Sequence, residues 1–220
     1  MAETLPPPAG IDVLEAMYTT RAMRRLKPDP IPAETLRAIL DAAIRGPSGG
    51  NSQGWAFVAV QDPALKLQLE KVYRPALEAL FQPGGPYYKP LNSEDAELAA
   101  RTRKMADSAL HLAHHLHEAP VIIVPCVRTG GRPTDISTGS SIYPAVQNLM
   151  IAARAFGIGI TLTTVHRMRQ DDVRAALGIP ADYETAALIP LGYPRGRWGV
   201  AARRPVEEVA FGDRWGEPLP

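Results

Sequence analysis

Short strand-like runs that lie far apart constrain the fold of this chain of 220 residues more than any other feature. Apolar runs indicate strands at 55–60, 121–127, 160–164 and 185–192. Apolar residues spaced three and four apart predict helices at about 12–18, 32–45, 65–80, 94–117, 139–156 and 171–177. Because the helices outnumber the strands and separate them, we expect an α+β domain or a three-layer α/β/α domain.

No internal repeat or linker divides the sequence, so we expect a single domain over residues 1–220, with a flexible N-terminus at 1–10. Pro125 lies inside the strand predicted at 121–127 and indicates an edge strand or a bulge, because proline cannot donate a ladder hydrogen bond. The tail at 194–220 is basic and irregular and has no pattern that would form a core. We expect this C-terminal extension to pack on another surface.

Charge and cysteine content exclude several classes of protein. The formal net charge is +1, which gives no overall attraction to nucleic acid or membranes. Cys126 is the one cysteine, so no internal disulfide can form, and its apolar surroundings predict a buried, inert thiol. The first residues lack the pattern of a signal peptide, and the longest apolar run, 119–127, is shorter than the roughly 20 residues that span a bilayer. We therefore expect a cytoplasmic protein.

A loop rich in glycine and amide side chains precedes the first strand. Its sequence is Pro47-Ser48-Gly49-Gly50-Asn51-Ser52-Gln53-Gly54, followed by Trp55. Glycine lets a backbone adopt positive φ and approach a ligand closely, and the serine and amide side chains offer hydrogen bonds. A mere connector does not need this composition, so we interpret the loop as one that wraps a flat molecule with polar edges.

Arginines cluster near both ends of a chain that is almost neutral. Arg21, Arg24 and Arg25 lie within five positions, and Arg203 and Arg204 are adjacent. Converging like charges need an anion between them, and the planar guanidinium suits phosphate. Two alternatives stay open: each cluster is a solvated surface, or 21–27 is a nucleic-acid patch. The neutral overall charge and the absence of interleaved aromatic residues argue against the second.

The sequence lacks the motifs of several common catalytic sites. It has no Gly-x-Gly-x-x-Gly motif, no phosphate-binding Gly-x-x-x-x-Gly-Lys loop and no Gly-x-Ser-x-Gly elbow. His111 and His115 share a helix face but lack accompanying cysteine or acidic ligands, so we expect no metal site. Phosphate-binding arginines without an obvious catalytic side chain fit an organic cofactor that performs the chemistry.

The segments Arg21–Pro28 and Pro47–Trp55 resemble the two N-terminal motifs of the FMN-dependent nitroreductase family. Ala145–Ala153 with Gly157-Ile158-Gly159 is similar to that family's central dimer helix, and Leu191–Pro194 with Arg203-Arg204-Pro205 to its C-terminal pattern. The resemblance covers nearly the whole chain in the right order. The sequence departs from the family where Thr20 replaces a frequent arginine, Ala22 a frequent serine and Gly54 the usual proline. Without a hydroxyl at Ala22, the grip on phosphate would depend more on the arginines.

The resemblance implies an α+β nitroreductase-like fold with three α/β/α layers and a mixed central sheet. It also implies a homodimer with FMN at the subunit interface, in which the C-terminal extension at 194–220 packs on the partner subunit. Arg21, Arg24 and the pair Arg203-Arg204 would hold the FMN phosphate or the pyrimidine edge, and the loop at 47–51 would come from the partner subunit. Leu162, Thr163 and Thr164 would lie near flavin N5, where backbone N–H groups could tune hydride transfer. The full set of cofactor-binding residues that it implies is Arg21, Ala22, Arg24, Arg25, Pro47, Ser48, Gly49, Asn51, Leu162, Thr163, Thr164, Arg203 and Arg204.

The activity that the resemblance implies is ping-pong hydride transfer from NADH or NADPH, through flavin N5, to a nitroaromatic, quinone or similar electron-poor acceptor. Arg24 would place positive charge near flavin N1. Tyr87 and Tyr88, in the loop 82–90, are candidates for contact with the acceptor, and His166 for a proton donor to it. Two alternatives remain: another flavin reaction, such as reductive dehalogenation or flavin fragmentation, and a flavin-binding protein without activity.

Overall fold

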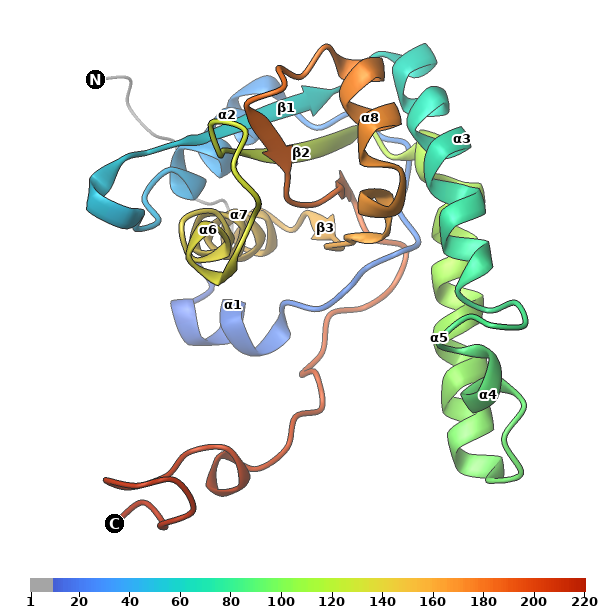
Figure 1. Ribbon diagram of the computed structural model, residues 1–220, viewed down its shortest axis with the longest axis vertical. Helices are drawn as coiled ribbons and strands as arrows, with labels where there is room; N and C mark the ends of the chain where they lie inside the picture. The colour runs from blue at the N-terminus through green and yellow to red at the C-terminus, as the bar shows by residue number, and fades with distance from the viewer. Residues whose placement is uncertain (1–9) are drawn as a thin grey trace.

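Five short strands form one sheet in the computed structural model, which describes residues 10–220 (Figure 1). The flexible N-terminus that we expect at 1–10 therefore lies outside the described residues, apart from Gly10. The sheet order is β1 (Trp55–Val60), β2 (Val121–Arg128), β5 (Ile189–Gly192) and β3 (Gly159–Ile160), and β4 (Tyr183–Thr185) also pairs with β2. All ladders between these strands are antiparallel. The isolated bridge between Ala22 and Ile160 is parallel. The predicted mixed sheet is therefore almost wholly antiparallel within the described residues.

Helices cover both faces of this sheet, because β2 is apolar on both sides. Ile122, Val124 and Cys126 pack in one core, with side chains of α3 (Pro63–Ala79), α5 (Ala96–His114) and α8 (Gln170–Leu177). The alternate residues Val121, Ile123 and Val127 pack in a second core with α2 (Ala33–Ala43) and α7 (Tyr143–Ala155). This arrangement confirms the α+β class. Burial of Cys126 raises the pKa of its thiol to about 11, in agreement with the expected inert cysteine.

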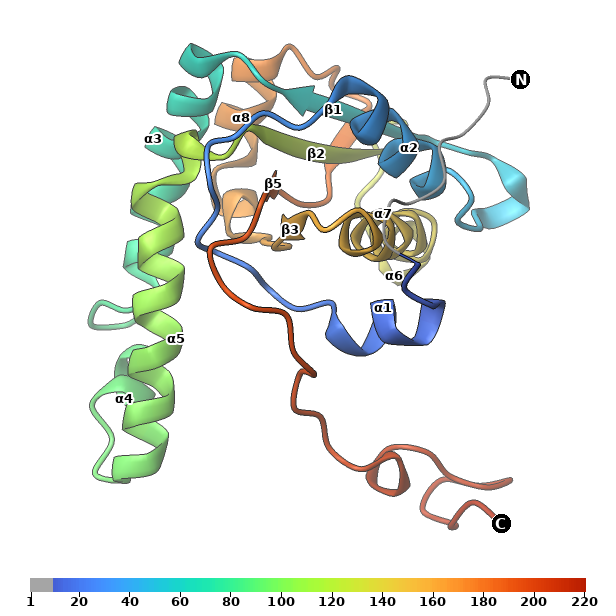
Figure 2. The ribbon, with the colours of Figure 1, turned by 180° about the vertical axis from the view of Figure 1, so that it is seen from behind.

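The remaining helices are short. They are α1 (Val13–Thr19), α4 (Tyr88–Leu91), α6 (Ile136–Ser140) and four 3₁₀ turns, η1 (Gly49–Asn51), η2 (Leu116–Glu118), η3 (Val165–Arg169) and η4 (Val206–Glu208). Both ribbon views show α3 and α5 as a hairpin that extends well beyond the sheet (Figures 1 and 2). No helix among residues 10–220 is both long enough and apolar enough to cross a membrane.

Four predicted segments differ from the structure. The helix predicted at 139–156 is divided into α6 and α7, because Asp135 caps a separate turn and the next helix begins at Tyr143, with Pro144 in its first turn. The strand predicted at 160–164 ends at Ile160, and the one predicted at 185–192 is divided into β4 and β5. The loop predicted at 82–90 includes the start of α4.

Pro125 does not mark an edge strand, because β2 pairs with β1 on one side and with β4 and β5 on the other. Its carbonyl accepts the N–H of Ala186 at 2.8 Å. The nitrogen and the carbonyl of a strand residue point to the same side, so the missing N–H falls where β4 and β5 are interrupted. The sheet thus tolerates a proline in an interior strand.

His166, in η3, is completely buried rather than placed toward a ligand. Its Nε2 lies 3.0 Å from the Thr185 hydroxyl, which donates its own hydrogen to Oε1 of Gln170 at 3.1 Å. The Thr185 oxygen therefore accepts from Nε2–H, and the imidazole is neutral. Burial, followed by the charge of Arg167, lowers the pKa of His166 from 6.5 to about 4. This position does not support the predicted proton donation to substrate.

Replacing His166 should make the unfolding free energy less dependent on pH below about pH 6.5. His166 binds a proton below pH 6.5 when the chain is unfolded but only near pH 4 when folded, so stability present above pH 6.5 is lost as the pH falls. Between pH 8 and 5, we expect wild type to lose about 2 kcal/mol more unfolding free energy than H166Q in urea titrations. Parallel profiles for wild type and H166Q would contradict this assignment.

Candidate functional site

A cavity of about 130 Å³ lies between the end of β3 and the α3–α5 hairpin. Arg24 and the segment Thr161–Thr163 line one side of it, and Tyr73 of α3 contributes to the wall. The rest of the lining is mostly apolar and comes from the helical hairpin: Leu77, Leu80, Phe81, Tyr87, Met105, Ala109 and, after Thr163, Val165. The structure thus brings three of the predicted cofactor residues, Arg24, Leu162 and Thr163, to one cavity.

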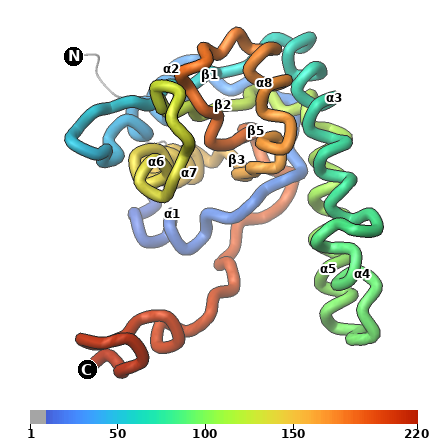
Figure 3. Tube along the Cα trace, in the orientation of Figure 1, coloured from blue at the N-terminus to red at the C-terminus, as the bar shows by residue number. Residues whose placement is uncertain are grey.

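The arginine segment reaches the cavity because it is hydrogen-bonded to the edge of the sheet. The N–H of Met23 donates to the carbonyl of Ile160 at 2.7 Å, and that of Lys27 donates to the carbonyl of Tyr193 at 2.8 Å. Met23 and Leu26 point into the core, while Arg21 and Arg25 are exposed and Arg24 is half-buried at the cavity. The tube in Figure 3 shows this segment beside the start of the C-terminal tail. In the described part of the chain, neither Arg21 nor Arg24 forms a salt bridge.

The segment after β3 offers fewer backbone donors than we expected. The N–H of Thr163 donates to the carbonyl of Leu188 at 3.1 Å, so it is already used within the sheet. Among residues 10–220, the N–H groups of Leu162 and Thr164 have no hydrogen-bond acceptor. The hydroxyl oxygen of Thr161 is also buried without a partner there. The donors left for a ligand are therefore those of Leu162 and Thr164, together with threonine hydroxyls.

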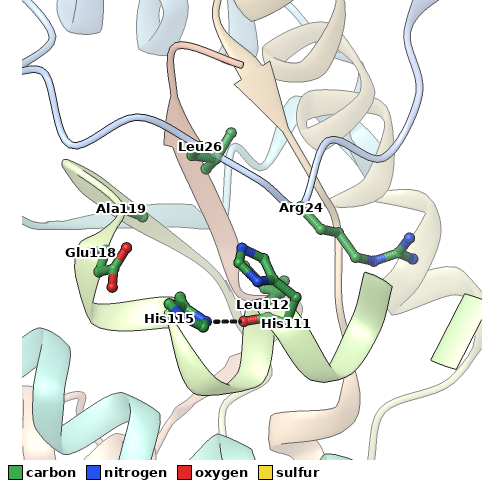
Figure 4. A pocket seen from close by; sticks show the side chains of 7 residues that line it. All are labelled: Arg24, Leu26, His111, Leu112, His115, Glu118 and Ala119. Carbon is green, nitrogen blue, oxygen red and sulfur yellow. Dashed lines mark hydrogen bonds between the residues drawn. The ribbon is translucent and has the colours of Figure 1, made fainter. Parts of the chain in front are cut away.

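Behind the arginine segment lies a second, much smaller hollow (Figure 4). The rings of His111 and His115 stack there with their centroids 4.2 Å apart, and Nη1 of Arg25 lies 3.2 Å from Nδ1 of His111. Burial first, and then the positive charges of Arg25 and His115, lower the pKa of His111. The hollow, about 10 Å³, leaves no room for a ligand. Arg25 is exposed and lines neither this hollow nor the larger cavity. No group of three or more His, Cys, Asp or Glu side chains within the described residues could hold a metal.

The glycine-rich loop lies away from the cavity in its own chain. It forms η1 and has left-handed φ values of 59° at Gly50, 54° at Asn51 and 49° at Gln53. The Ser48 hydroxyl accepts the N–H of Gln53 at 3.0 Å, which holds the turn. Figures 1 and 2 place this loop before β1, on the opposite side of the sheet from the α3–α5 hairpin. Pro47, Ser48, Gly49 and Asn51 therefore do not join Arg24 and Thr163 within one chain.

The C-terminal tail also leaves the body of the protein, carrying Arg203 and Arg204 with it (Figure 2). Both arginines are exposed, and Arg203 contacts only the neighbouring carbonyl of Ala202, at 2.9 Å among the described residues. Trp215 is 92% exposed, and further exposed apolar side chains of the tail are Val200, Val206, Val209 and Leu219. Exposed apolar surface of this kind marks an interaction site.

Of the residues predicted to contact the substrate, Tyr87 lines the cavity, where its ring stacks on Phe81 with the centroids 5.4 Å apart. Tyr88 belongs to α4 and does not line the cavity, and His166 is buried in the core. Sequence reasoning missed Tyr73 and Thr161. Tyr73 occupies a buried position of α3 and reads as an ordinary core residue, so the sequence held no signal for it.

The donor set fits FMN. Among residues 10–220, Arg21 and Arg24 form no ion pair, and the cavity lining adds hydroxyl groups but no carboxylate. Such a set favours a ligand with negative charge and several hydrogen-bond acceptors, and a phosphate-bearing flavin has both. The apolar side chains of α3 and α5 suit its flat ring system.

Comparisons with known proteins identify the family of this chain. The sequence profile described as the nitroreductase family matches residues 17–193. A protein of Thermus thermophilus named NADH dehydrogenase is 28% identical over 211 residues, which cover 96% of this chain and 99% of that protein. A 5,6-dimethylbenzimidazole synthase of Rhodospirillum rubrum is 31% identical over 211 residues, which cover 90% of this chain and 93% of the synthase.

A solved structure extends the likeness to the fold. The structure of oxidised iodotyrosine deiodinase, with FMN and 3-iodo-L-tyrosine bound, matches with a TM-score of 0.62 and 22% identity. The match covers 88% of this chain and 99% of the deiodinase chain. Profile, relatives and fold agree with the motifs quoted from the sequence, and the chain belongs to the nitroreductase family.

Proposed function

We propose that the protein is an FMN-dependent oxidoreductase that transfers hydride from NADH or NADPH to nitroaromatic, quinone or similar electron-poor acceptors. The observation that carries the proposal is the cavity beside β3, where an unpaired Arg24 and threonine hydroxyls meet an apolar helical wall. When bound, FMN supplies the chemistry, because its ring can take hydride from the nicotinamide and pass it on in two separate half-reactions.

The chain's own residues bind and orient the cofactor. Arg21, with Arg203 and Arg204 of a tail, would neutralise the phosphate, since an arginine without an internal carboxylate partner is available to an external anion. Arg24 would favour negative charge at the pyrimidine edge, and the N–H groups of Leu162 and Thr164 would donate to the ring near N5. Tyr87 and Phe81 would exclude water above the acceptor.

We further propose a homodimer in which each site draws on both chains. The loop at 47–51 lies far from Arg24 in its own chain, so it can serve a site only on another copy. The exposed apolar side chains of α1, Val13, Leu14, Met17 and Tyr18, together with those of the tail, offer a surface for that copy.

The names of the relatives do not settle the reaction, because they include a dehydrogenase, a synthase and a deiodinase. The purified protein should be yellow, lose its absorbance on anaerobic addition of NADH or NADPH, and regain it with a nitroaromatic compound. A yellow protein that neither nicotinamide reduces would contradict the reductase assignment and favour another flavin reaction or a binding role. A colourless protein that takes up no FMN would contradict the cofactor assignment itself.

Arg24 gives a direct test of the cavity. Replacement by alanine removes a charge-assisted hydrogen bond, so R24A should bind FMN about tenfold or more weakly in fluorescence titrations of the apoprotein. The variant R103A changes an exposed arginine on α5 that lines no part of the cavity and should bind as wild type does. Unchanged affinity in R24A would place FMN elsewhere.

Complementation between subunits tests the shared site. R24A damages the cavity of its own chain, whereas N51G removes the loop amide and keeps a residue suited to positive φ. In a heterodimer of R24A and N51G chains, one site carries both changes and the other carries neither. The doubly tagged and purified heterodimer should therefore show about half of the wild-type activity, above either parent dimer. Activity no higher than that of the parents would mean that each site belongs to one chain.

A further inference from the structure

We propose that Tyr73 is a positioning residue of the flavin site, whose phenol holds the Thr163 hydroxyl so that its hydrogen points to an acceptor atom of the bound ring. The inference rests on the proposed FMN-dependent function and extends it to a residue on the helical side of the cavity. Tyr73 is 2% exposed and lines the cavity, and its hydroxyl donates to Oγ1 of Thr163 at 3.2 Å.

The backbone of Thr163 is held in place from the opposite side. Its N–H donates to the carbonyl of Leu188 at 3.1 Å, and its carbonyl accepts the N–H of Leu188 at 2.9 Å. These two bonds form an antiparallel bridge that extends the pairing of β3 beyond Ile160. The backbone of Thr163 is therefore fixed on the sheet, and what remains to be oriented is its hydroxyl group.

Two hydrogen-bond donors fix the orientation of the Thr163 hydroxyl. The Thr163 oxygen accepts from the Tyr73 hydroxyl and, more weakly, from the N–H of Val165 at 3.5 Å. A hydroxyl has two lone pairs and one hydrogen, so both of its acceptor positions are used. With the Tyr73 hydroxyl as donor, the Thr163 hydroxyl donates to no other group among residues 10–220, and Thr163 borders the cavity. The hydrogen is left for a ligand in that cavity.

The groups around the Thr163 hydroxyl indicate which ligand atoms can accept its hydrogen bond. Arg24 borders the same cavity, and its charge acts on the Tyr73 phenol. The cavity presents a guanidinium and hydroxyl donors and no carboxylate. A ring edge with carbonyl oxygens and an unprotonated nitrogen satisfies this set, and the pyrimidine edge of a flavin has those groups. Burial raises the pKa of Tyr73, so the phenol keeps its hydrogen at neutral pH and remains a donor.

A phenylalanine at this position would fill the same space, so the hydroxyl can be tested without loss of packing. We expect Y73F to bind FMN about three- to tenfold more weakly than wild type, because one hydrogen bond is lost and the Thr163 rotor is released. T163V should weaken binding to the same extent or more, and T163S, which keeps the hydroxyl, should stay within about twofold. The matched control is Y143F, since the Tyr143 hydroxyl donates to the carbonyl of Ala186 at 3.1 Å, away from the cavity.

The double variant separates positioning from independent contact. If Tyr73 acts through Thr163, the variant with both Y73F and T163V should bind FMN no more weakly than T163V alone. The flavin reduction potential should also become more negative in Y73F, because a donor to the electron-rich ring is weakened, and a loss of packing alone would not cause that shift. Denaturant titrations of the apoproteins identify any variant whose fold is disturbed.

The outcomes are distinct. Failure of wild type to bind FMN would overturn the proposed function together with this inference. Binding by wild type, with the same affinity and potential in Y73F, would overturn the role of Tyr73 and leave the proposed function intact. Additive losses in the double variant would overturn the route through Thr163.

Discussion

The edge of the sheet at β3 is completed by a segment that is not itself a strand, and the candidate site depends on this pairing. β3 contains two residues, and the N–H of Met23 donates to the carbonyl of its last residue, Ile160, at 2.7 Å. Two register partners in the sheet, Gly159 and Gly192, lie under this segment. A Cβ atom at Gly159 would stand 3.1 Å from side-chain atoms of Met23 and Leu26. The missing side chains let the segment lie flat against the sheet and hold Arg24 at the cavity.

This arrangement places the parts of the site on two sides of the cavity. Thr163 and the segment that carries Arg24 are tied to the sheet by backbone hydrogen bonds, whereas Tyr73 and most of the apolar wall belong to the α3–α5 hairpin. The phenol of Tyr73 is where the two halves meet, because its hydroxyl reaches Thr163 across the cavity wall. The sheet side thus supplies fixed hydrogen-bond donors, and the helical side supplies shape.

Local patterns predicted the elements well where periodicity alone decides them. β1 has the predicted bounds, 55–60, and the helices α2, α3 and α5 agree within a few residues at each end. The predictions were wrong where distant contacts decide. Pro125 stands in an interior strand because the break between β4 and β5 faces its missing N–H, and nothing near it in the sequence marks that break. His166 was placed at the substrate because it follows the cavity threonines, yet it turns into the core to bond Thr185.

The candidate site was predictable only through motifs. The resemblance led to Arg24, Leu162 and Thr163, which the structure does bring to one cavity. Tyr73 lies 90 positions from Thr163 and occupies an ordinary core position of its helix, so no local pattern could pair them. The loop at 47–51 and the C-terminal tail lie apart from the α3–α5 side of the sheet, where this cavity is, so the fold of one chain does not test the cofactor roles predicted for them.

If the protein has the proposed function, we expect selectivity for the acceptor to depend on the helical side of the cavity. Donors fixed to the sheet would be engaged by the cofactor and so cannot discriminate between acceptors. The stacked pair of Phe81 and Tyr87 lies at the turn that follows α3, beside the apolar side chains of α3 and α5. Changes there alter the shape of the cavity without disturbing the pairing of β3 with the arginine segment. The relatives and the solved structure carry the names of a dehydrogenase, a synthase and a deiodinase, so the shared fold does not by itself decide the reaction.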